Sequence, residues 1–347
     1  MAARPTLADI AAQAGVSVAT ASKALNGRSD ISAGTRDRVL KIISDTGYQS
    51  PAERRESPQR PVILALLAGI DTMYSASVLH GIVDAAAAQG AETVLRFTAP
   101  SSPGSSAGDS GDELPEGCAG IIAVTFGTRG LRSRYLEAGV PIAVVDPSEA
   151  QHPAKWMNVG ATNWTGARSA TEHLLGLGHR RIGWIGGPVH SEPSIERLHG
   201  YRAALQSAGV PLDPAIERVT DFTVAGGEAA ARELLALDDR PTAIVAANDE
   251  LAIGVLDAAR DLALHIPRDL SVTGFDDTPQ ASWSTPKLTS VRQPLVDMGR
   301  MAVTMILEAH ANGTARSSSP HLQLATSLKV RESTAPPLTH EARDAAG

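Results

Sequence analysis

The sequence predicts a small N-terminal all-α domain followed by an α/β core that contains two doubly wound parallel sheets. Three observations lead to this fold class. Apolar residues in the first fifty positions recur at helical spacing, whereas from residue 62 onward short apolar runs alternate with helical patterns. A proline-rich, charged stretch at 51–61 separates the two patterns. The chain has 347 residues, which is enough for two or three domains of ordinary size.

The first fifty residues contain three predicted helices. Thr6 and Asp9 have capping-box spacing, which starts the first helix at residue 7. Gly15 ends this helix, because glycine adopts the left-handed conformation without strain. Ser17 caps a second helix after a very short turn, and Ser32 caps a third. Two helices joined by so tight a turn predict a helix-turn-helix.

The core is predicted from the alternation of strands and helices after residue 61. Glycines at 90, 178 and 209 are expected helix stops. A helix is expected between the second and third strands, but residues 101–113 have the composition of a flexible loop. The predicted strands begin at residues 62, 93, 120, 141, 181, 242 and 270, and the predicted helices cover 78–89, 164–177, 196–208, 226–237 and 249–263.

Composition and charge restrict the partners of the chain. Hydrophobic residues make up 43% of the sequence and charged residues 20%, as in folded proteins. The net charge is -7, but the first sixty residues carry nine basic and six acidic side chains, so a basic end precedes an acidic remainder. The start lacks a signal-peptide pattern and no run of eighteen apolar residues occurs, so we expect a cytoplasmic protein. The single Cys118 and the absence of zinc-type spacing predict no disulfide, metal or cofactor.

The second predicted helix has one packing face and one free face. The free face carries small residues and a lysine, which suits close approach to a DNA major groove. Lys23 can reach a guanine edge or a phosphate, and Val18 and Ala19 can touch thymine methyl groups. Hydroxyl side chains at helix starts can hold phosphates, namely Thr6, Ser17 and Thr35. The alternative is an ordinary amphipathic helix with a solvated lysine.

The segment PTLADIAAQAGVSVATASKALNGRSDISAGTRDRVLKIISDTGY, residues 5–48, resembles the DNA-binding domain of the LacI/GalR family of bacterial transcription regulators. The likeness continues through LGHRRIGWIGGP, ERLHGYRAAL, PTAIVAANDELAIG, SVTGFDD and PKLTSVRQP, so it covers nearly the whole chain. It implies a homodimeric repressor that binds double-stranded operator DNA through a helix-turn-helix. It also implies a two-lobed periplasmic-binding-protein-like core that binds a sugar effector. The candidate DNA-binding residues are Thr6, Leu7, Ser17, Val18, Ala19, Thr20, Ser22, Lys23, Asn26, Thr35 and Tyr48.

The linker departs from the family pattern. In the family a hinge helix wedges a leucine into the minor groove, whereas the matching region here, AERRESPQR, offers Ser57 and Pro58 and no leucine. The linker arginines Arg54, Arg55 and Arg60 can bind phosphates or a narrow groove, and the alternative is that they are simply solvated. Whether this proline-containing hinge enters the minor groove is therefore open.

Polar and aromatic residues follow the predicted strands, where ligands of doubly wound sheets bind. Carboxylates, amides and a guanidinium can hold vicinal hydroxyls with two hydrogen bonds each, while an aromatic ring packs on the C–H surface of a sugar. Each such residue also has an ordinary structural explanation, such as a helix cap or a core position. The candidate effector-binding residues are Asp71, Phe126, Asp146, Asn163, Arg197, Phe222, Asn248, Asp276 and Gln293. The resemblance supports Arg197, Asn248 and Asp276 most, through RLHG, ANDE and GFDD.

The predicted organisation has four parts: residues 1–50 form the helix-turn-helix domain, 51–61 the hinge, 62–333 the core and 334–347 a flexible tail. The N-terminal lobe covers about 62–161 and 292–321, and the C-terminal lobe about 162–291 and 322–333. The tail contains no leucine heptad, so we expect a homodimer rather than a tetramer, with Trp283 in the subunit interface as its neighbourhood is in the family.

Other function classes are weaker. A sugar-binding transport receptor would share the two lobes, but it would need a signal peptide and would not need residues 1–50. An enzyme is disfavoured because GWIGGP at 183–188 lacks the spacing of a dinucleotide-binding turn, and no catalytic residues are assigned. A corepressor-dependent repressor or an activator on the same scaffold is the runner-up. An aromatic-rich cleft would favour a plant-derived mono- or disaccharide, such as cellobiose or a xyloside, as effector.

Overall fold

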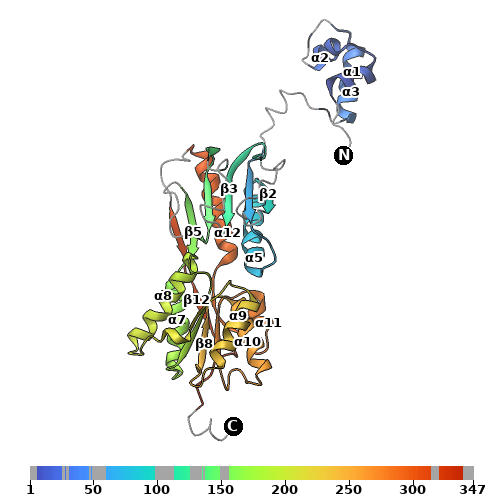
Figure 1. Cartoon of the computed structure of the whole chain (residues 1–347). Helices are drawn as coiled ribbons and strands as arrows, with labels where there is room; N and C mark the ends of the chain where they lie inside the picture. Colours follow the sequence, from blue (N-terminus) through green and yellow to red (C-terminus); the bar gives the residue numbers. More distant parts are fainter. Residues whose placement is uncertain are drawn as a thin grey trace, which may run out of the picture. The chain divides into compact units, whose positions relative to one another are not determined.

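The computed structural model describes residues 6–25, 28, 31–46, 48, 60–97, 113–125, 135, 137–148, 156–313 and 320–338. The chain divides into two compact units, Met1–Arg60 and Pro61–Gly347 (Figure 1). Several predictions fall outside the described residues: those for Asn26, for the linker residues Arg54, Arg55, Ser57 and Pro58, for the loop at 101–112, and for Phe126.

The described residues of the first unit form the helices α1 (Leu7–Ala14), α2 (Val18–Leu25) and α3 (Ala33–Thr46). The capping box is confirmed, since Thr6 N donates to Asp9 Oδ2 at 2.7 Å and Asp9 N donates to Thr6 Oγ1 at 3.3 Å. Gly15 ends α1 at φ 66°, as predicted. The buried residues of the three helices form one small core: Ile10, Ala11, Ala14, Ala21, Ala24 and Val39, together with Tyr48.

The first lobe of the second unit is built on a six-stranded sheet in the order β11-β5-β4-β3-β1-β2, with every neighbouring pair parallel. One face packs on two helices, α5 (Met73–Ala88) and α12 (Leu295–Ala311). The other face packs on Tyr135 and Trp156. The strands are β1 (Val62–Leu67), β2 (Glu92–Phe97), β3 (Cys118–Val124), β4 (Ile142–Val145), β5 (Met157–Ala161) and β11 (His321–Leu324).

Helices α5 and α12 approach each other closely at two glycines. A Cβ atom at Gly81 would lie 2.0 Å from Val296 O, and one at Gly299 would lie 2.3 Å from Val78 O. Neither position therefore accepts a side chain without moving a backbone. This crossing fixes the start of α5, which contributes to the site described below.

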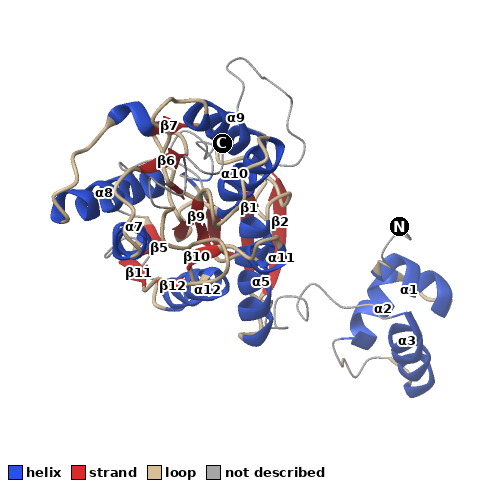
Figure 2. Ribbon diagram, turned by 90° about the horizontal axis from the view of Figure 1, so that it is seen from below, coloured by secondary structure: helices blue, strands red, loops and turns tan. Residues whose placement is uncertain are grey.

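The second lobe contains a six-stranded sheet in the order β12-β10-β9-β8-β6-β7, in which only the β10–β12 pair is antiparallel. Helix α7 packs Ala167 and Ala170 against Phe275 on one face, and α10 lies over Gly274 on the other, with α8 beside α7 (Figure 2). The strands are β6 (Ile182–Gly186), β7 (Glu217–Val219), β8 (Ala243–Ala246), β9 (Ser271–Asp276), β10 (Thr289–Arg292) and β12 (Ser327–Lys329). The helices are α7 (Asn163–Gly176), α8 (Glu192–Ser207), the 3-10 turn Pro214–Ile216, α9 (Val224–Leu235), α10 (Asp249–Asp261) and α11 (Pro279–Trp283).

Three chain crossings connect the two lobes. The first lies between β5 and α7 and the second between β10 and α12. The return crossing falls at Ala325 and Thr326, because β11 still belongs to the first sheet; the predicted boundary at 322 was too early. The ordered core also extends past its predicted end, since Thr334 Oγ1 bonds to His173 Nε2 at 3.0 Å and Ala335 N donates to Ser271 Oγ at 3.0 Å.

All seven predicted strands and five predicted helices of the core are present. The sequence reading missed strands β5, β7, β10, β11 and β12 and helices α11 and α12. Glycines 90, 178 and 209 end helices with positive φ, as predicted. In the described part of the chain, no helix combines the length and apolar character that a bilayer span requires.

Candidate functional sites

Helices α1 and α2 meet through small side chains. Ala11 and Ala21 are buried, and Val16 N donates to Ala11 O at 3.0 Å directly after the left-handed Gly15. Ser17 then caps α2 by accepting from Thr20 N at 3.1 Å. The turn between the helices is therefore as short as the sequence predicts, and α2 leaves it with its first turn fixed.

The outer face of α2 is exposed. Val18, Ala19 and Lys23 lie at the surface, and Val18 has 48% of its area exposed. This face contributes nothing to the small core, which α2 reaches through Ala21 and Ala24. An exposed valine beside exposed alanine and lysine side chains on a rigid helix is a surface suited to recognition.

The other predicted DNA-contact residues have mixed positions. Thr6 is exposed and caps α1. Tyr48 is only 7% exposed and belongs to the core of the unit, so packing accounts for this side chain. The remaining predicted residues are half-buried: Leu7, Thr20, Ser22 and Thr35.

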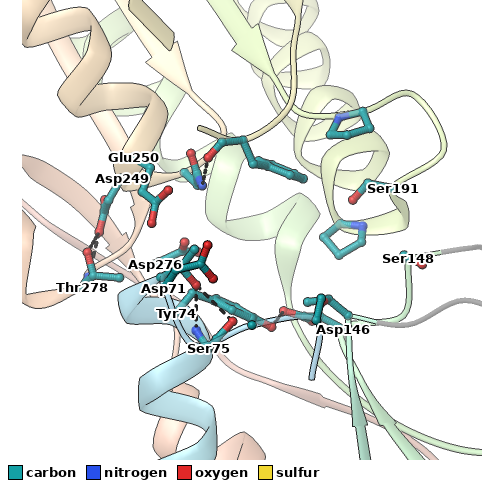
Figure 3. Close-up of a pocket in the computed structure, with 18 of the residues that line it drawn as sticks. Asp71, Tyr74, Ser75, Asp146, Ser148, Ser191, Asp249, Glu250, Asp276 and Thr278 are labelled. Atoms are coloured by element: carbon teal, nitrogen blue, oxygen red, sulfur yellow. Dashed lines mark hydrogen bonds between the residues drawn. The ribbon is translucent and has the colours of Figure 1, made fainter. Parts of the chain in front are cut away.

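A cavity of about 340 Å³ lies between the two lobes, at the carboxyl ends of both sheets (Figure 3). Asn163 and Gln293 do not line it, but each holds a residue that does. Six of the nine predicted effector residues line this cavity: Asp71, Asp146, Arg197, Phe222, Asn248 and Asp276.

The strand ends at the cavity have an unusual backbone. Thr125, Asp146, Phe222 and Asp276 all line the cavity and hold positive φ values of 59°, 46°, 66° and 106°. Such conformations cost non-glycine residues about 1–3 kcal/mol each and persist where the surrounding structure enforces them. The fold therefore fixes these side chains in the cavity before any ligand arrives.

Arg197 is buried on α8 and held from several sides. Its Nε donates to Asn163 Oδ1 at 2.8 Å and its Nη1 donates to Ala247 O at 2.7 Å. The guanidinium stacks over the Phe275 ring at 3.9 Å, and Nη1 lies 3.7 Å from Asp276 Oδ1. Arg197 also lines the cavity, and a guanidinium has five N–H donors, more than these contacts use.

Asp276 sits at the end of β9 and is 5% exposed. Gln293 Nε2 donates to Asp276 Oδ1 at 2.6 Å. Burial raises the pKa of Asp276 to about 8, with nearby Asp249 adding to the rise and Arg197 opposing it. Burial likewise raises the pKa of Asp249 to about 7, against three hydrogen bonds from Thr278 and Ser290.

Asp146 and Tyr74 form a pair on the first-lobe side of the cavity (Figure 3). Tyr74 Oη donates to Asp146 Oδ2 at 2.6 Å. Burial, with the adjacent carboxylate, raises the pKa of Tyr74 well above its usual value, so the phenol keeps its proton and remains a donor. Burial also raises the pKa of Asp146, while Arg197 and the Tyr74 bond oppose that rise. Asp146 Oδ1 is buried and has no hydrogen-bond partner among the described residues.

Asn248 and Phe222 shape the second-lobe wall. Asn248 caps α10 through its Oδ1, which accepts from Leu251 N at 2.9 Å, and its Nδ2 donates to Phe222 O at 3.2 Å. A Cβ atom at Gly187 would lie 2.2 Å from the Phe222 ring, so the ring rests on bare backbone. The ordinary explanation of Asn248 as a helix cap is thus correct, and the same bonds place the Phe222 ring at the cavity wall.

The sequence reading missed several lining residues. Tyr74 and Ser75 come from the first turn of α5, whose predicted start at residue 78 was too late, and Glu250 lies two residues after Asn248 in the sequence. The cap of α5, in which Ser75 N donates to Thr72 Oγ1 at 3.1 Å, was the available signal for an earlier helix start. The expectation of an aromatic-rich cleft was wrong for the described residues, where Tyr74 and Phe222 supply the aromatic rings beside five carboxyl side chains.

Comparison with known proteins identifies the family. The model for bacterial regulatory proteins of the lacI family matches residues 6–50, and the model for a periplasmic binding protein-like domain matches residues 171–334. The HTH-type transcriptional regulator MalR of Streptomyces coelicolor is 36% identical over 346 residues, which cover 95% of this chain and 96% of MalR. The chain belongs to the lacI family of bacterial regulatory proteins. The predicted LacI/GalR-type regulator is confirmed.

Two further relatives bear on both units. The HTH-type transcriptional regulator CelR of Thermobifida fusca is 32% identical, covering 95% of this chain and 98% of CelR. A solved CelR–cellobiose complex matches with a TM-score of 0.67 and 31% identity, covering 95% of this chain and all of that one. The lac repressor dimer bound to operator and the anti-inducer ONPF matches with a TM-score of 0.72 and 25% identity over 96% of this chain and all of that one. The predicted fold, a helix-turn-helix unit followed by a two-lobed α/β core, is confirmed.

Proposed function

We propose that this lacI-family regulator is a repressor that binds operator DNA through its first unit and is released when a sugar occupies the cavity of the second. One observation carries the proposal: the same chain has an exposed face on α2 and a cavity between two lobes that six of the predicted effector residues line. The lac repressor bound to operator and the CelR–cellobiose complex support each half.

The DNA half of the proposal depends on α2. Its exposed face enters the major groove, where Lys23 reaches a base edge or phosphate and Val18 and Ala19 contact thymine methyl groups. One three-helix unit neutralises too few phosphates for tight binding, so we propose a two-fold dimer on a roughly palindromic operator. Trp283, which is 73% exposed on α11, is assigned to the interface between the two copies.

Release by a sugar depends on a cavity that is lined by residues of both lobes. Tyr74 and Asp146 belong to the first lobe, whereas Arg197 and Asp276 belong to the second. A sugar that bonds to both pairs favours a closed arrangement of the lobes, which changes the positions of the two linkers in the dimer. To move the regulator from nearly all DNA-bound to nearly all released, the sugar must bind the released form more tightly than the DNA-bound form by about 5.5 kcal/mol.

The proposal also sets location and chemistry. A regulator of bacterial transcription works where the chromosome is, so we place the protein in the cytoplasm. We assign no catalytic residue, because the relatives that match the chain are transcriptional regulators.

The test is a binding titration with the full-length protein and a labelled fragment of the DNA upstream of its own gene, measured by fluorescence anisotropy. We expect tight binding that weakens steeply with salt and is reversed by a sugar. Absence of specific binding to that fragment at low ionic strength would reject the proposal. Tighter binding in the presence of sugar would instead indicate a corepressor-dependent repressor, which is the runner-up.

A further inference from the structure

A second cavity, of about 430 Å³, lies beside two of the crossings that connect the lobes. Gln293 and Pro294 of the β10–α12 crossing line it, as does Ala325 of the return crossing. The rest of its lining comes from α5 and α12 of the first lobe and from β9, β10 and β12 of the second. A ligand bound there contacts both lobes and the segments that join them, so its affinity depends on how the lobes are arranged.

Two cationic side chains of the second cavity are neighbours on adjacent strands. Strands β10 and β12 are antiparallel, with Arg292 opposite Ser327 and Ser290 opposite Lys329. Opposite residues of such a pair point to the same face of the sheet, and so do residues two apart on one strand. Arg292 and Lys329 are therefore diagonal neighbours on one face, with Cα atoms about 7–8 Å apart. Two long side chains at this spacing can donate to one anion.

The carboxyl groups that line the second cavity are already compensated. Asp277 forms an ion pair with Arg331, and Asp297 Oδ1 lies 3.0 Å from Arg300 Nη1. Burial raises the pKa of Asp276 to about 8, so this side chain is mainly protonated at neutral pH. The acids therefore do not neutralise the two cations.

The second cavity has a surplus of positive charge. Arg292 and Lys329 form no ion pair with a carboxylate in the part of the chain that the structure describes. The first turn of α12 lies in the same wall, and Pro294, directly before it, supplies no side-chain cap. The amide N–H groups at the start of a helix favour anions. Both features suit a ligand with a negative charge.

A buried acceptor in the second cavity has no partner. Gln293 is 3% exposed, and it lines this cavity but not the first one. Its Nε2 donates to Asp276 Oδ1 at 2.6 Å, whereas its Oε1 is buried without a hydrogen-bond partner among the described residues. An unpaired buried acceptor costs free energy, which a ligand hydroxyl can recover. Because Asp276 lines both cavities, the Gln293 bond also links them.

We propose that the second cavity binds a small hydroxylated anion, either a hydroxy acid or a phosphate ester, as a further regulatory ligand. Its anionic group accepts from Arg292 and Lys329, and its hydroxyl group donates to Gln293 Oε1. The bound anion favours the arrangement of the lobes that it fits, so it changes DNA affinity without entering the first cavity. The effect on DNA rests on the proposed function, whereas the binding site does not.

Binding is measured by isothermal titration calorimetry on the full-length protein, without sugar or DNA and at constant ionic strength. The probes are malate, a hydroxy acid, and glycerol 3-phosphate, a phosphate ester, with glycerol as the uncharged control. We expect at least one of the anions to bind with one site per chain, and glycerol not to bind. Failure of both anions to bind, or equal binding of glycerol, overturns the proposal.

Two variants test where the anion binds. Arg292→Gln and Lys329→Gln each remove one charge, and neither side chain is buried, so the fold should tolerate both changes. We expect each variant to weaken anion binding about 10-fold or more, because each removes a charge-assisted hydrogen bond. Arg260→Gln is the matched control, since that side chain is 68% exposed and does not line the cavity. Unchanged binding in both cavity variants refutes the site.

Matched ligands test the contact to Gln293. Succinate and propyl phosphate keep the charges of malate and glycerol 3-phosphate but lack their hydroxyl groups. We expect the ligand without a hydroxyl group to bind about 10-fold more weakly than its hydroxylated counterpart. Equal affinities would refute the hydrogen bond to Gln293 Oε1.

The regulatory effect is measured by fluorescence anisotropy with the DNA upstream of the gene, at constant ionic strength. We expect the anion to change the DNA affinity of the unchanged protein about 5-fold or more, and to have no effect on Arg292→Gln. A protein that binds the anion but not its DNA contradicts the proposed function and keeps the second site. A protein that binds both, with no effect of one on the other, refutes the regulatory role.

Discussion

We assign recognition to two surfaces, the outer face of α2 and the cavity between the lobes, and the fold positions their side chains in opposite ways. On α2 the recognising side chains are exposed and the fold depends on other residues, the alanines of the inner face. In the cavity the recognising side chains are buried, and they bond to the backbone and to one another. A substitution on the outer face of α2 should therefore change DNA binding without changing stability. A substitution in the cavity should change both ligand binding and stability.

Arg197→Ala should have the largest effect and should damage both properties of the core. Its removal leaves two buried acceptors, Asn163 Oδ1 and Ala247 O, without their donor, at a cost of about 1–3 kcal/mol each. We expect a lower melting temperature of the core and loss of sugar-induced DNA release, measured by calorimetry and anisotropy. Arg260→Ala, whose side chain is 68% exposed, is the control and should change neither. Normal sugar response of the Arg197 variant would remove this residue from the site.

Lys23→Ala should damage recognition alone. Loss of a base contact costs about 1–3 kcal/mol in operator affinity, whereas an exposed side chain contributes little to stability. We therefore expect the affinity for the operator to fall more than the affinity for random duplex, each measured against the unchanged protein. The melting temperature should stay the same. Lys41→Ala, an exposed lysine on α3, is the matched control. Equal losses on operator and random DNA would reassign Lys23 to a phosphate contact.

The same contrast explains what could be predicted from the sequence. In the first unit, local signals decide the structure: Thr6 and Asp9 set the start of α1, Gly15 sets its end and Ser17 starts α2. Each signal acts over three or four residues, so helix bounds and the exposed face of α2 follow from the sequence directly.

In the cavity, strand ends were predictable but their partners were not. Asp146, Asn248 and Asp276 stand directly at or after apolar runs, and the carboxyl-end rule placed them together. Tyr74 is 72 residues from Asp146 in the sequence, and the packing of α5 on α12 and on the first sheet brings it there. Likewise, the predicted effector residues Asn163 and Gln293 do not line the cavity but bond to Arg197 and Asp276, which do. Contacts between residues so far apart in the sequence cannot be predicted from local sequence patterns.

The stability of the two units should depend on pH in opposite directions. The pKa values of Asp276 and Asp249 in the folded protein, about 8 and about 7, lie above the ordinary value of 3.8, so the folded core binds more protons than the unfolded chain. Their contribution is present at acidic pH and is lost as pH rises to about 8, at up to about 1.4 kcal/mol per pH unit and group. In the first unit the capping bonds from Thr6 lower the pKa of Asp9, so its contribution is lost only as pH falls through that lowered pKa.

The measurement is thermal unfolding of the sugar-free protein between about pH 6 and pH 8.5. We expect the melting temperature of the core to decrease across this range. Asp276→Asn, which cannot titrate, should flatten the curve, and Asp239→Asn should leave it unchanged because that carboxyl is exposed. A core that gains stability with rising pH would show that Asp276 and Asp249 are ionised throughout.

Ser17→Ala should have the smallest effect. It tests whether an exposed residue of the first unit can also contribute to its stability. Ser17 is exposed like Lys23, but its Oγ accepts from Thr20 N at 3.1 Å and so caps α2. Replacing such a cap with alanine costs about 1 kcal/mol. Hydrogen exchange of the α2 amides in the full-length protein should therefore become faster, and affinity should decrease to a similar extent on operator and random DNA. Ser17→Asn restores the cap and should restore slow exchange; if exchange in Ser17→Ala is as slow as in the unchanged protein, the exposed side of α2 carries no structural role at all.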